Sequence, residues 1–201
     1  PRGAPLTTPP LPASRFAAAL ALLGLGLLAL LLPNLGAAPL ERAEIYFLDA
    51  ARGMVDSGDW VVPRYEGQPF FDKPILSYWL MAAAMEGLGT TAGAARLVPV
   101  LASIGLLLAT AWLGTLLYDR RSALWGALVL ATTLAFLSFA RVAMSDMLLA
   151  LWTTLAVGLA VLAYRPGAPS WTVPALGAVA GLYQAQARGR QGETAVTAGL
   201  A

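Results

Sequence analysis

The chain has 201 residues, of which 58% are hydrophobic and 12% charged, a composition that soluble domains seldom show and that places the protein in a lipid bilayer. The formal net charge is +2 and the 13 basic residues are scattered, which argues against a nucleic-acid partner. Cysteine and histidine are absent, which excludes disulfides, thiolate or histidine metal sites and histidine-activated nucleophiles, so acid–base chemistry falls to carboxylates, lysine or tyrosine.

The chain begins with a Pro-rich polar segment, residues 1–15, which is predicted to be disordered. Residues 16–32 follow as 17 residues without a charge and predict a first transmembrane helix. A cleaved signal peptide is the alternative interpretation, because Arg15 precedes the run and "GAAP" follows it. In both cases the next segment lies outside the cytoplasm.

Residues 34–93 are expected to form an interfacial loop with short amphipathic juxtamembrane helices. Its first part carries seven of the eleven acidic residues: Glu41, Glu44, Asp49, Asp56, Asp59, Glu66 and Asp72. The stretch "ERAEIYFLDAARGMV" predicts a helix with Ile45, Leu48, Ala51 and Val55 on one face, ended by Gly58.

The apolar run 75–88 has 14 residues, which as a helix reach about 21 Å, less than the roughly 30 Å of a bilayer core. It also contains Glu86, so it is predicted to lie in the interface, with Tyr78 and Trp79 at headgroup depth.

Further spans are predicted at residues 97–118, 123–140 and 147–164, with a partial span at 171–183 that contains Pro174. Residues 184–201 turn abruptly polar and are interpreted as a truncated or frame-shifted tail. The fold class predicted is therefore an all-α, multi-span integral membrane bundle with an exoplasmic loop, its membrane domain covering residues 16–183.

The positions of the basic residues depend on whether residues 75–88 cross the bilayer. If they do not cross, Arg120, Arg121 and Arg165 fall on the cytoplasmic side, while the acidic loop and Asp146 fall outside. If they do cross, Asp146 lies on the face opposite Glu44. The first topology fits better, although Arg96 and Arg141 then lie on the outer side, against the rule that basic loops stay in the cytoplasm.

Several residues are candidates for chemistry, and each has a structural alternative. Asp146, at the start of a membrane helix, is a functional candidate or, with Ser145, a helix cap. Glu44 is a candidate carboxylate or part of a solvated helix face. Lys73 and Arg141 are candidate phosphate contacts or anchors that extend to the headgroups.

The motifs "SGDWVVPR", "FFDKP" and "SDM", in this order, resemble the amino-terminal part of the polyprenyl-phosphate sugar glycosyltransferases of superclass C. This family includes the aminoarabinose transferase of lipid A and the protein O-mannosyltransferases. The resemblance covers residues 16–164 and implies an inner-membrane enzyme with an active site on the exoplasmic side.

The resemblance also implies that a polyprenyl-phosphate sugar is the donor, that membrane lipid surrounds the enzyme, and that a lipid or protein accepts the sugar with inversion. It implies a catalytic role for Asp146 and phosphate or acceptor binding by Lys73, with Asp72 as the accompanying acid. The family's first loop opens with an Asp-Glu pair, for which this chain has Ala43 and Glu44. Three interpretations of the missing acid are open: Glu44 or Glu41 substitutes for it, this branch of the family works differently, or the chain is inactive.

In the expected mechanism, Glu44 or Asp146 orients or deprotonates the acceptor hydroxyl, while Lys73, with Arg141, stabilises the departing phosphate. This requires Glu44, Lys73 and Asp146 to approach one another in a cavity at the outer surface. No cofactor or metal-ligand set is predicted, although carboxylates alone can bind a divalent cation.

Family members are much longer, so the 201-residue polypeptide alone is expected to have little transferase activity. Two other hypotheses remain: a non-catalytic membrane protein, such as a carrier or assembly subunit, and an inactive fragment of the transferase.

Overall fold

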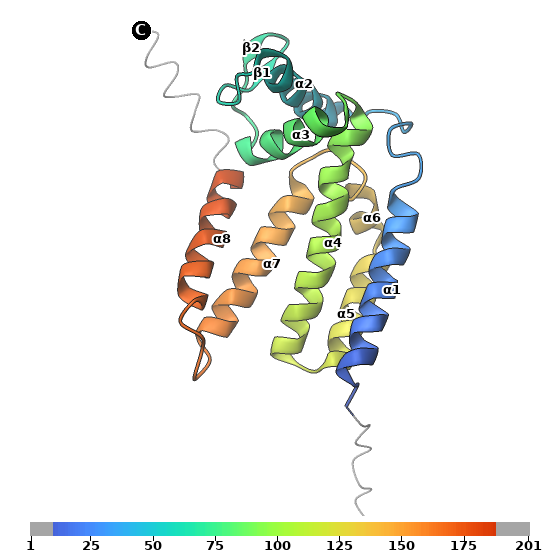
Figure 1. Cartoon of the computed structure of the whole chain (residues 1–201), viewed down its shortest axis with the longest axis vertical. Helices are drawn as coiled ribbons and strands as arrows, with labels where there is room; N and C mark the ends of the chain where they lie inside the picture. The colour runs from blue at the N-terminus through green and yellow to red at the C-terminus, as the bar shows by residue number, and fades with distance from the viewer. Residues whose placement is uncertain (1–9, 188–201) are drawn as a thin grey trace, which may run out of the picture.

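The structure, a computed structural model, describes residues 10–187 as a bundle of helices with one short β-hairpin (Figure 1). Residues 1–9 of the disordered lead predicted at 1–15, and residues 188–201 of the tail predicted at 184–201, lie outside the described residues. The prediction is wrong for residues 13–15, which begin the first helix. The elements are α1 (Ala13–Leu31), α2 (Arg42–Ser57), β1 (Arg64–Tyr65), β2 (Gln68–Pro69), α3 (Ile75–Leu88), α4 (Ala92–Leu117), α5 (Arg120–Thr132), α6 (Leu134–Phe139), α7 (Asp146–Ala163) and α8 (Thr172–Ala187). The all-helical, multi-span fold expected from the sequence is confirmed.

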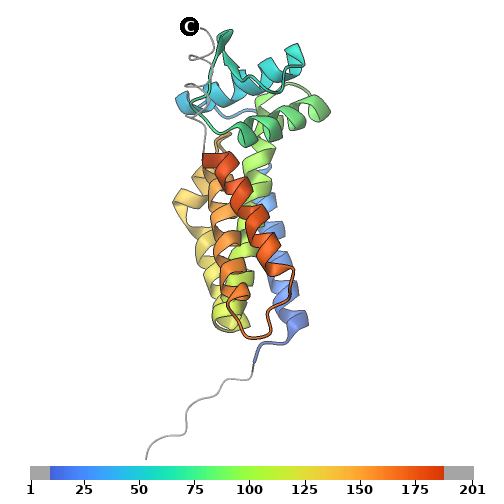
Figure 2. The same cartoon turned by 90° about the vertical axis from the view of Figure 1, so that its left-hand side faces the viewer.

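Five helices, α1, α4, α5, α7 and α8, run along the bundle, while α2, the hairpin and α3 lie across one end of it (Figures 1 and 2). We call this end the capped end. The chain reaches it at the end of α1 and leaves it at the starts of α4 and α7. The connection from α4 to α5 and that from α7 to α8 lie at the other end, which we call the open end.

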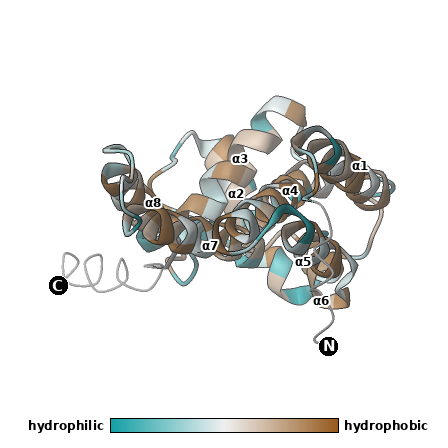
Figure 3. Cartoon of the chain, turned by 90° about the horizontal axis from the view of Figure 1, so that it is seen from below, coloured by the Kyte–Doolittle hydropathy of each residue, from teal (hydrophilic) through white to brown (hydrophobic). Residues whose placement is uncertain are grey.

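The bundle helices have the composition of membrane spans. Within residues 10–187, α1, α4 and α7 are long and apolar enough to cross a bilayer. Large apolar side chains are exposed on several of them, including Leu22, Leu101 and Val157. Figure 3, which looks along the bundle, shows hydrophobic residues around these helices. A surface of this kind is stable against lipid rather than water.

Close contact between α4 and α7 depends on small residues. A Cβ atom built on Gly158 would lie 2.1 Å from Trp112 Cζ3, and one built on Gly105 would lie 3.1 Å from a methyl carbon of Leu151. Helices in a bilayer associate mainly by such close packing, because lipid gives them no hydrophobic drive.

The apolar run 75–88 forms α3, with the bounds that its composition predicted, and α3 lies beside α2 across the capped end (Figure 1). Tyr78 is fully buried against Phe47, at 5.5 Å between ring centroids, so its ring faces the protein interior and not the lipid headgroups. Trp79 is 41% exposed, and its Nε1 donates to the Trp60 carbonyl.

The amphipathic helix predicted in the loop forms α2, and its buried face coincides with the predicted one only in part. Phe47, Leu48, Ala51 and Met54 are buried, whereas Ile45 is 39% exposed. The prediction placed Ile45 on the buried face because Phe47 was left out of the period. The helix ends at Gly58, as predicted, with a left-handed φ of 70°.

The single span predicted at 123–140 is two helices, α5 and α6, separated by an extended Thr133. The hydroxyl groups of Thr132 and Thr133 donate to carbonyls one turn earlier, on Leu128 and Val129. β-Branched hydroxyl residues compete in this way with the helix ladder. The last helix, α8, continues to Ala187, beyond the predicted limit of 183.

Candidate functional site

The capped end gathers all of the site residues expected from the sequence. Glu44 lies in the first turn of α2, Asp72 and Lys73 precede α3, and Arg141 and Asp146 flank the loop that enters α7. Because α3 lies across the end of the bundle, these segments meet on one side of the spanning helices (Figure 1).

A buried ion pair joins Glu44 to Arg96, near the start of α4. Arg96 Nε donates to Glu44 Oε1 and Arg96 Nη2 donates to Glu44 Oε2, both at 2.7 Å, which is the bidentate geometry that suits these two groups. Glu44 is 0% exposed and Arg96 is 2% exposed. Glu44 therefore does not lie on a solvated helix face, which was the structural alternative considered for it.

Two backbone groups complete the hydrogen bonding of the Glu44 carboxylate. The Ala143 N–H donates to Oε1 at 2.8 Å, and the Glu41 N–H donates to Oε2 at 3.3 Å as part of a capping box at the start of α2. Burial raises the pKa of Glu44, but hydrogen bonds from Arg96 and Ala143 and the charge of Arg96 together bring it below its ordinary value. Glu44 is therefore ionised at neutral pH, and each oxygen accepts two hydrogen bonds.

Arg96 also binds the connection between α1 and α2. Its Nη1 donates to the Leu35 and Ala38 carbonyls at 2.8 and 3.0 Å, and its Nη2 donates to the Pro39 carbonyl at 3.0 Å. The planar guanidinium has five N–H groups on three nitrogens. The three bonds to carbonyls and the two bonds to Glu44 together use all three nitrogens.

Sequence reasoning did not single out Arg96, although it left a signal. Arg96 lies inside an apolar segment that is long enough to cross a membrane, where an ionisable residue usually has a partner. It was counted only as an exception to the charge rule. Its burial with Glu44 removes that conflict, since the pair carries no net charge.

Arg141 makes its contacts within the protein. Its Nη1 donates to the Leu30 carbonyl at 3.2 Å and its Nη2 to the Pro33 carbonyl at 2.8 Å. These carbonyls lie at the end of α1, where the helix leaves such groups unpaired. A phosphate-binding role for Arg141 would have to share or replace these bonds.

Asp72 and Lys73 form an ion pair at the start of α3. Lys73 Nζ lies 2.7 Å from Asp72 Oδ2, and the two side chains are 42% and 36% exposed for Asp72 and Lys73 respectively. An ammonium group has three donors, so Lys73 can contact an incoming anion while it keeps Asp72. Pro74, which follows, is the N-cap residue of α3.

Asp146 is the first residue of α7 and is exposed. Ser145 is the N-cap, but its side chain makes no capping hydrogen bond, so the predicted side-chain cap is not formed. Among the residues that the structure describes, the Asp146 carboxylate has no hydrogen-bond or ion-pair partner. Asp146 is thus a carboxylate at the capped end that a substrate can reach.

The three side chains predicted to share a cavity, Glu44, Lys73 and Asp146, lie in segments that meet at the capped end. Glu44 reaches the loop before Asp146 through Ala143, yet it points toward Arg96. Across residues 10–187, no hydrogen bond or ion pair joins any two of the three side chains. Within the same residues, no group of three or more Asp or Glu side chains could hold a metal ion.

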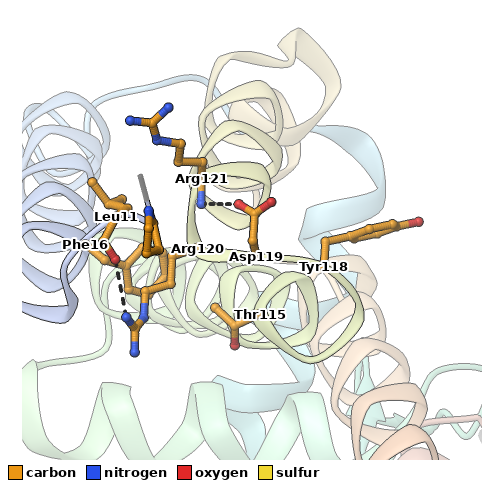
Figure 4. A pocket seen from close by; sticks show the side chains of 8 residues that line it. Leu11, Phe16, Thr115, Tyr118, Asp119, Arg120 and Arg121 are labelled. Carbon is orange, nitrogen blue, oxygen red and sulfur yellow. Dashed lines mark hydrogen bonds between the residues drawn. The ribbon is translucent and has the colours of Figure 1, made fainter. Parts of the chain in front are cut away.

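A cavity of about 690 Å³ lies at the open end, between the start of α1 and the turn from α4 to α5 (Figure 4). In the close-up, Arg120 reaches the Leu11 carbonyl, to which its Nη1 donates at 3.3 Å, while Asp119 accepts from the Arg121 N–H. None of the predicted site residues lines this cavity, which the bundle separates from the capped end.

Comparison with known proteins agrees with this arrangement. The chain is 32% identical over 123 residues to the undecaprenyl phosphate-alpha-4-amino-4-deoxy-L-arabinose arabinosyl transferase of Pectobacterium carotovorum, covering 61% of this chain and 22% of that protein. It is 32% identical to the transferase of the same name from Yersinia enterocolitica, covering 55% of this chain and 20% of that one. The chain thus spans about a fifth of the length of these relatives.

Among solved structures, ArnT from Cupriavidus metallidurans bound to undecaprenyl phosphate has the same fold over 87% of this chain and 33% of its own, with a TM-score of 0.76 and 21% identity. The apo form of that protein gives the same TM-score at 22% identity, with 85% of this chain and 33% of its own covered. The model of the dolichyl-phosphate-mannose-protein mannosyltransferase family matches residues 36–182, which include the cap and the helices from α4 to α7. The chain therefore belongs to the dolichyl-phosphate-mannose-protein mannosyltransferase family.

Proposed function

We propose that the chain forms the amino-terminal part of an inner-membrane glycosyltransferase that moves a sugar from a polyprenyl-phosphate donor to a lipid or protein acceptor. The single observation that carries the proposal is that Lys73 and Asp146, from segments far apart in sequence, lie exposed at one end of a membrane bundle. The names of the relatives support an undecaprenyl-phosphate-linked amino sugar as the donor.

The geometry supports a role for each residue. Lys73 is a partly exposed cation at the edge of the capped end, and a positive charge there stabilises the phosphate as it leaves the sugar. Asp146 is the exposed carboxylate and orients or deprotonates the acceptor hydroxyl as that oxygen attacks the anomeric carbon. The oxygen–carbon bond forms as the bond to phosphate breaks, which inverts the configuration at that carbon. An anionic acceptor needs no base.

The side of the membrane follows from charge. Arg120, Arg121 and Arg165 lie at the open end, and basic connections of this kind stay in the cytoplasm. The capped end, with its acidic loop, then faces outward, where the acceptor would be met.

Binding of undecaprenyl phosphate to the 201-residue chain in lipid nanodiscs tests the proposal. Lys73→Met is expected to weaken binding about tenfold or more, because a hydrogen bond to a charged group is lost. Arg121→Met, at the open end, is the matched control and should leave binding unchanged. Equal binding of undecaprenol, which lacks the phosphate, or equal effects of the two variants would contradict the proposal.

A further inference from the structure

We propose that Glu44 and Arg96 act as positioning residues that hold the loop of residues 140–145, and through it Asp146, at the capped end. The proposal rests on the function proposed above for Asp146. It assigns to Glu44 a role other than that of a catalytic carboxylate.

The contacts of Glu44 leave no place for a substrate. A carboxylate has about four acceptor positions. Here Oε1 accepts from Arg96 and Ala143, and Oε2 accepts from Arg96 and Glu41. The residue is also 0% exposed, so an acceptor hydroxyl cannot approach either oxygen while these bonds persist.

The same contacts join four segments that are distant in sequence. Arg96 belongs to α4 and binds the carbonyls of the α1–α2 connection, while Glu44 belongs to α2 and binds the loop before α7 through Ala143. Removing one partner therefore releases more than a single bond, because the other partner becomes a buried charge without compensation.

The loop has two anchors, and Asp146 follows them directly. Ala143 is held by Glu44, and Arg141 is held by the carbonyls of Leu30 and Pro33. Asp146 begins α7 three residues after Ala143, and among the described residues its side chain has no partner of its own. Met147 and Leu148, which follow it, are buried, so the packing of α7 and the two loop anchors together set where Asp146 lies. Lys73 pairs instead with Asp72, at 2.7 Å.

Two variants separate positioning from base catalysis. The polar pair variant, Glu44→Gln with Arg96→Met, keeps one side-chain oxygen that can accept from Ala143, leaves no buried charge and cannot act as a base. The apolar pair variant, Glu44→Met with Arg96→Met, removes that acceptor as well, and paired replacement of a buried ion pair is often tolerated by the fold. The whole 201-residue chain in nanodiscs is used for each variant.

The first readout is hydrogen exchange of the backbone amides of residues 140–146. In the apolar pair variant, exchange at Ala143 is expected to rise about tenfold or more, as for loss of a bond to a charged acceptor. In the polar pair variant it should stay within about threefold of the wild type, because the bond to a neutral acceptor is weaker by only part of that amount. Unchanged exchange in the apolar pair variant, or equal exchange in both variants, would overturn the proposal.

The second readout is the mobility of a spin label at position 146. The chain has no cysteine, so Asp146→Cys gives a single labelling site. The label is expected to become more mobile in the apolar pair variant and to keep its mobility in the polar pair variant. A label that is equally immobile in all three backgrounds would show that the pair does not position residue 146.

Binding of undecaprenyl phosphate, measured in parallel, keeps the two proposals distinct. If the wild type binds no undecaprenyl phosphate but the exchange and mobility patterns hold, the proposed function fails and the positioning of residue 146 stands. If the wild type binds and the patterns fail, the function stands and the positioning role is refuted.

Discussion

Replacing Arg96 by methionine is the perturbation whose consequence the structure defines most fully. The change removes five hydrogen bonds, two to Glu44 and three to the carbonyls of Leu35, Ala38 and Pro39. It also leaves the Glu44 carboxylate buried and without a counter-charge. Breaking one side of a buried pair lowers the free energy of unfolding by about 3–5 kcal/mol, so we expect a loss of that size.

The assay is thermal unfolding of the chain in nanodiscs, followed by tryptophan fluorescence. A loss of 3–5 kcal/mol corresponds to a lower midpoint by roughly 10 °C for a domain of this length. Arg64→Met is the matched control, because Arg64 faces Asp59 at 3.9 Å with both side chains well exposed, and it should leave the midpoint unchanged. Equal effects of the two variants would refute the reasoning that the Glu44–Arg96 pair holds the cap.

Three other predictions concern stability and the missing acid. Gly158→Ala is expected to lower the free energy of unfolding by about 1–3 kcal/mol, because the new methyl group meets the Trp112 ring. Gly126→Ala is the control and should have no such effect, because the space around Gly126 is open. Equal thermal midpoints for the two variants would contradict the close contact between Gly158 and Trp112. Because the pKa of Glu44 is lowered in the folded state, its contribution to the free energy of unfolding is present above the unfolded-state pKa and is lost as pH falls through the folded-state pKa. The thermal midpoint of the wild type should therefore fall more in acid than that of Glu44→Gln. Ala43→Asp restores the acid implied by the family in the first turn of α2, where the helix dipole favours a negative charge by about 0.3–1 kcal/mol. This variant should fold as well as the wild type and should increase the release of undecaprenyl phosphate from the donor. Unchanged release would argue against a catalytic acid at position 43.

Length and composition were enough to predict the features that depend on local chemistry. The 14-residue run that forms α3 is too short to cross a bilayer and contains the charged Glu86, and its helix has the predicted bounds. The end of α2 at Gly58 was also predictable, since glycine adopts the left-handed conformation without strain. The motif around Lys73 and the start of α7 at Asp146 identified the exposed groups of the capped end.

The features that depend on distant partners were not predictable in the same way. Glu44 looked like a solvated or catalytic carboxylate because its partner, Arg96, lies 52 residues away in another helix. Arg141 looked like a phosphate ligand because the carbonyls at the end of α1 that it binds are more than 100 residues away. The break at Thr133 was not predictable from composition, because residues 123–140 carry no charge and the threonines there make the same kind of backbone hydrogen bond as Thr153 and Thr154 in the unbroken α7.

The most direct test of the shared end is labelling of single cysteines in sealed membranes with a thiol reagent that cannot cross the bilayer. The chain has no native cysteine, so Asp72→Cys, Asp146→Cys and Arg121→Cys each report one position. The structure predicts that positions 72 and 146 react from one side of the membrane and position 121 from the other. Reaction of positions 72 and 146 from opposite sides would contradict a common site for sugar transfer.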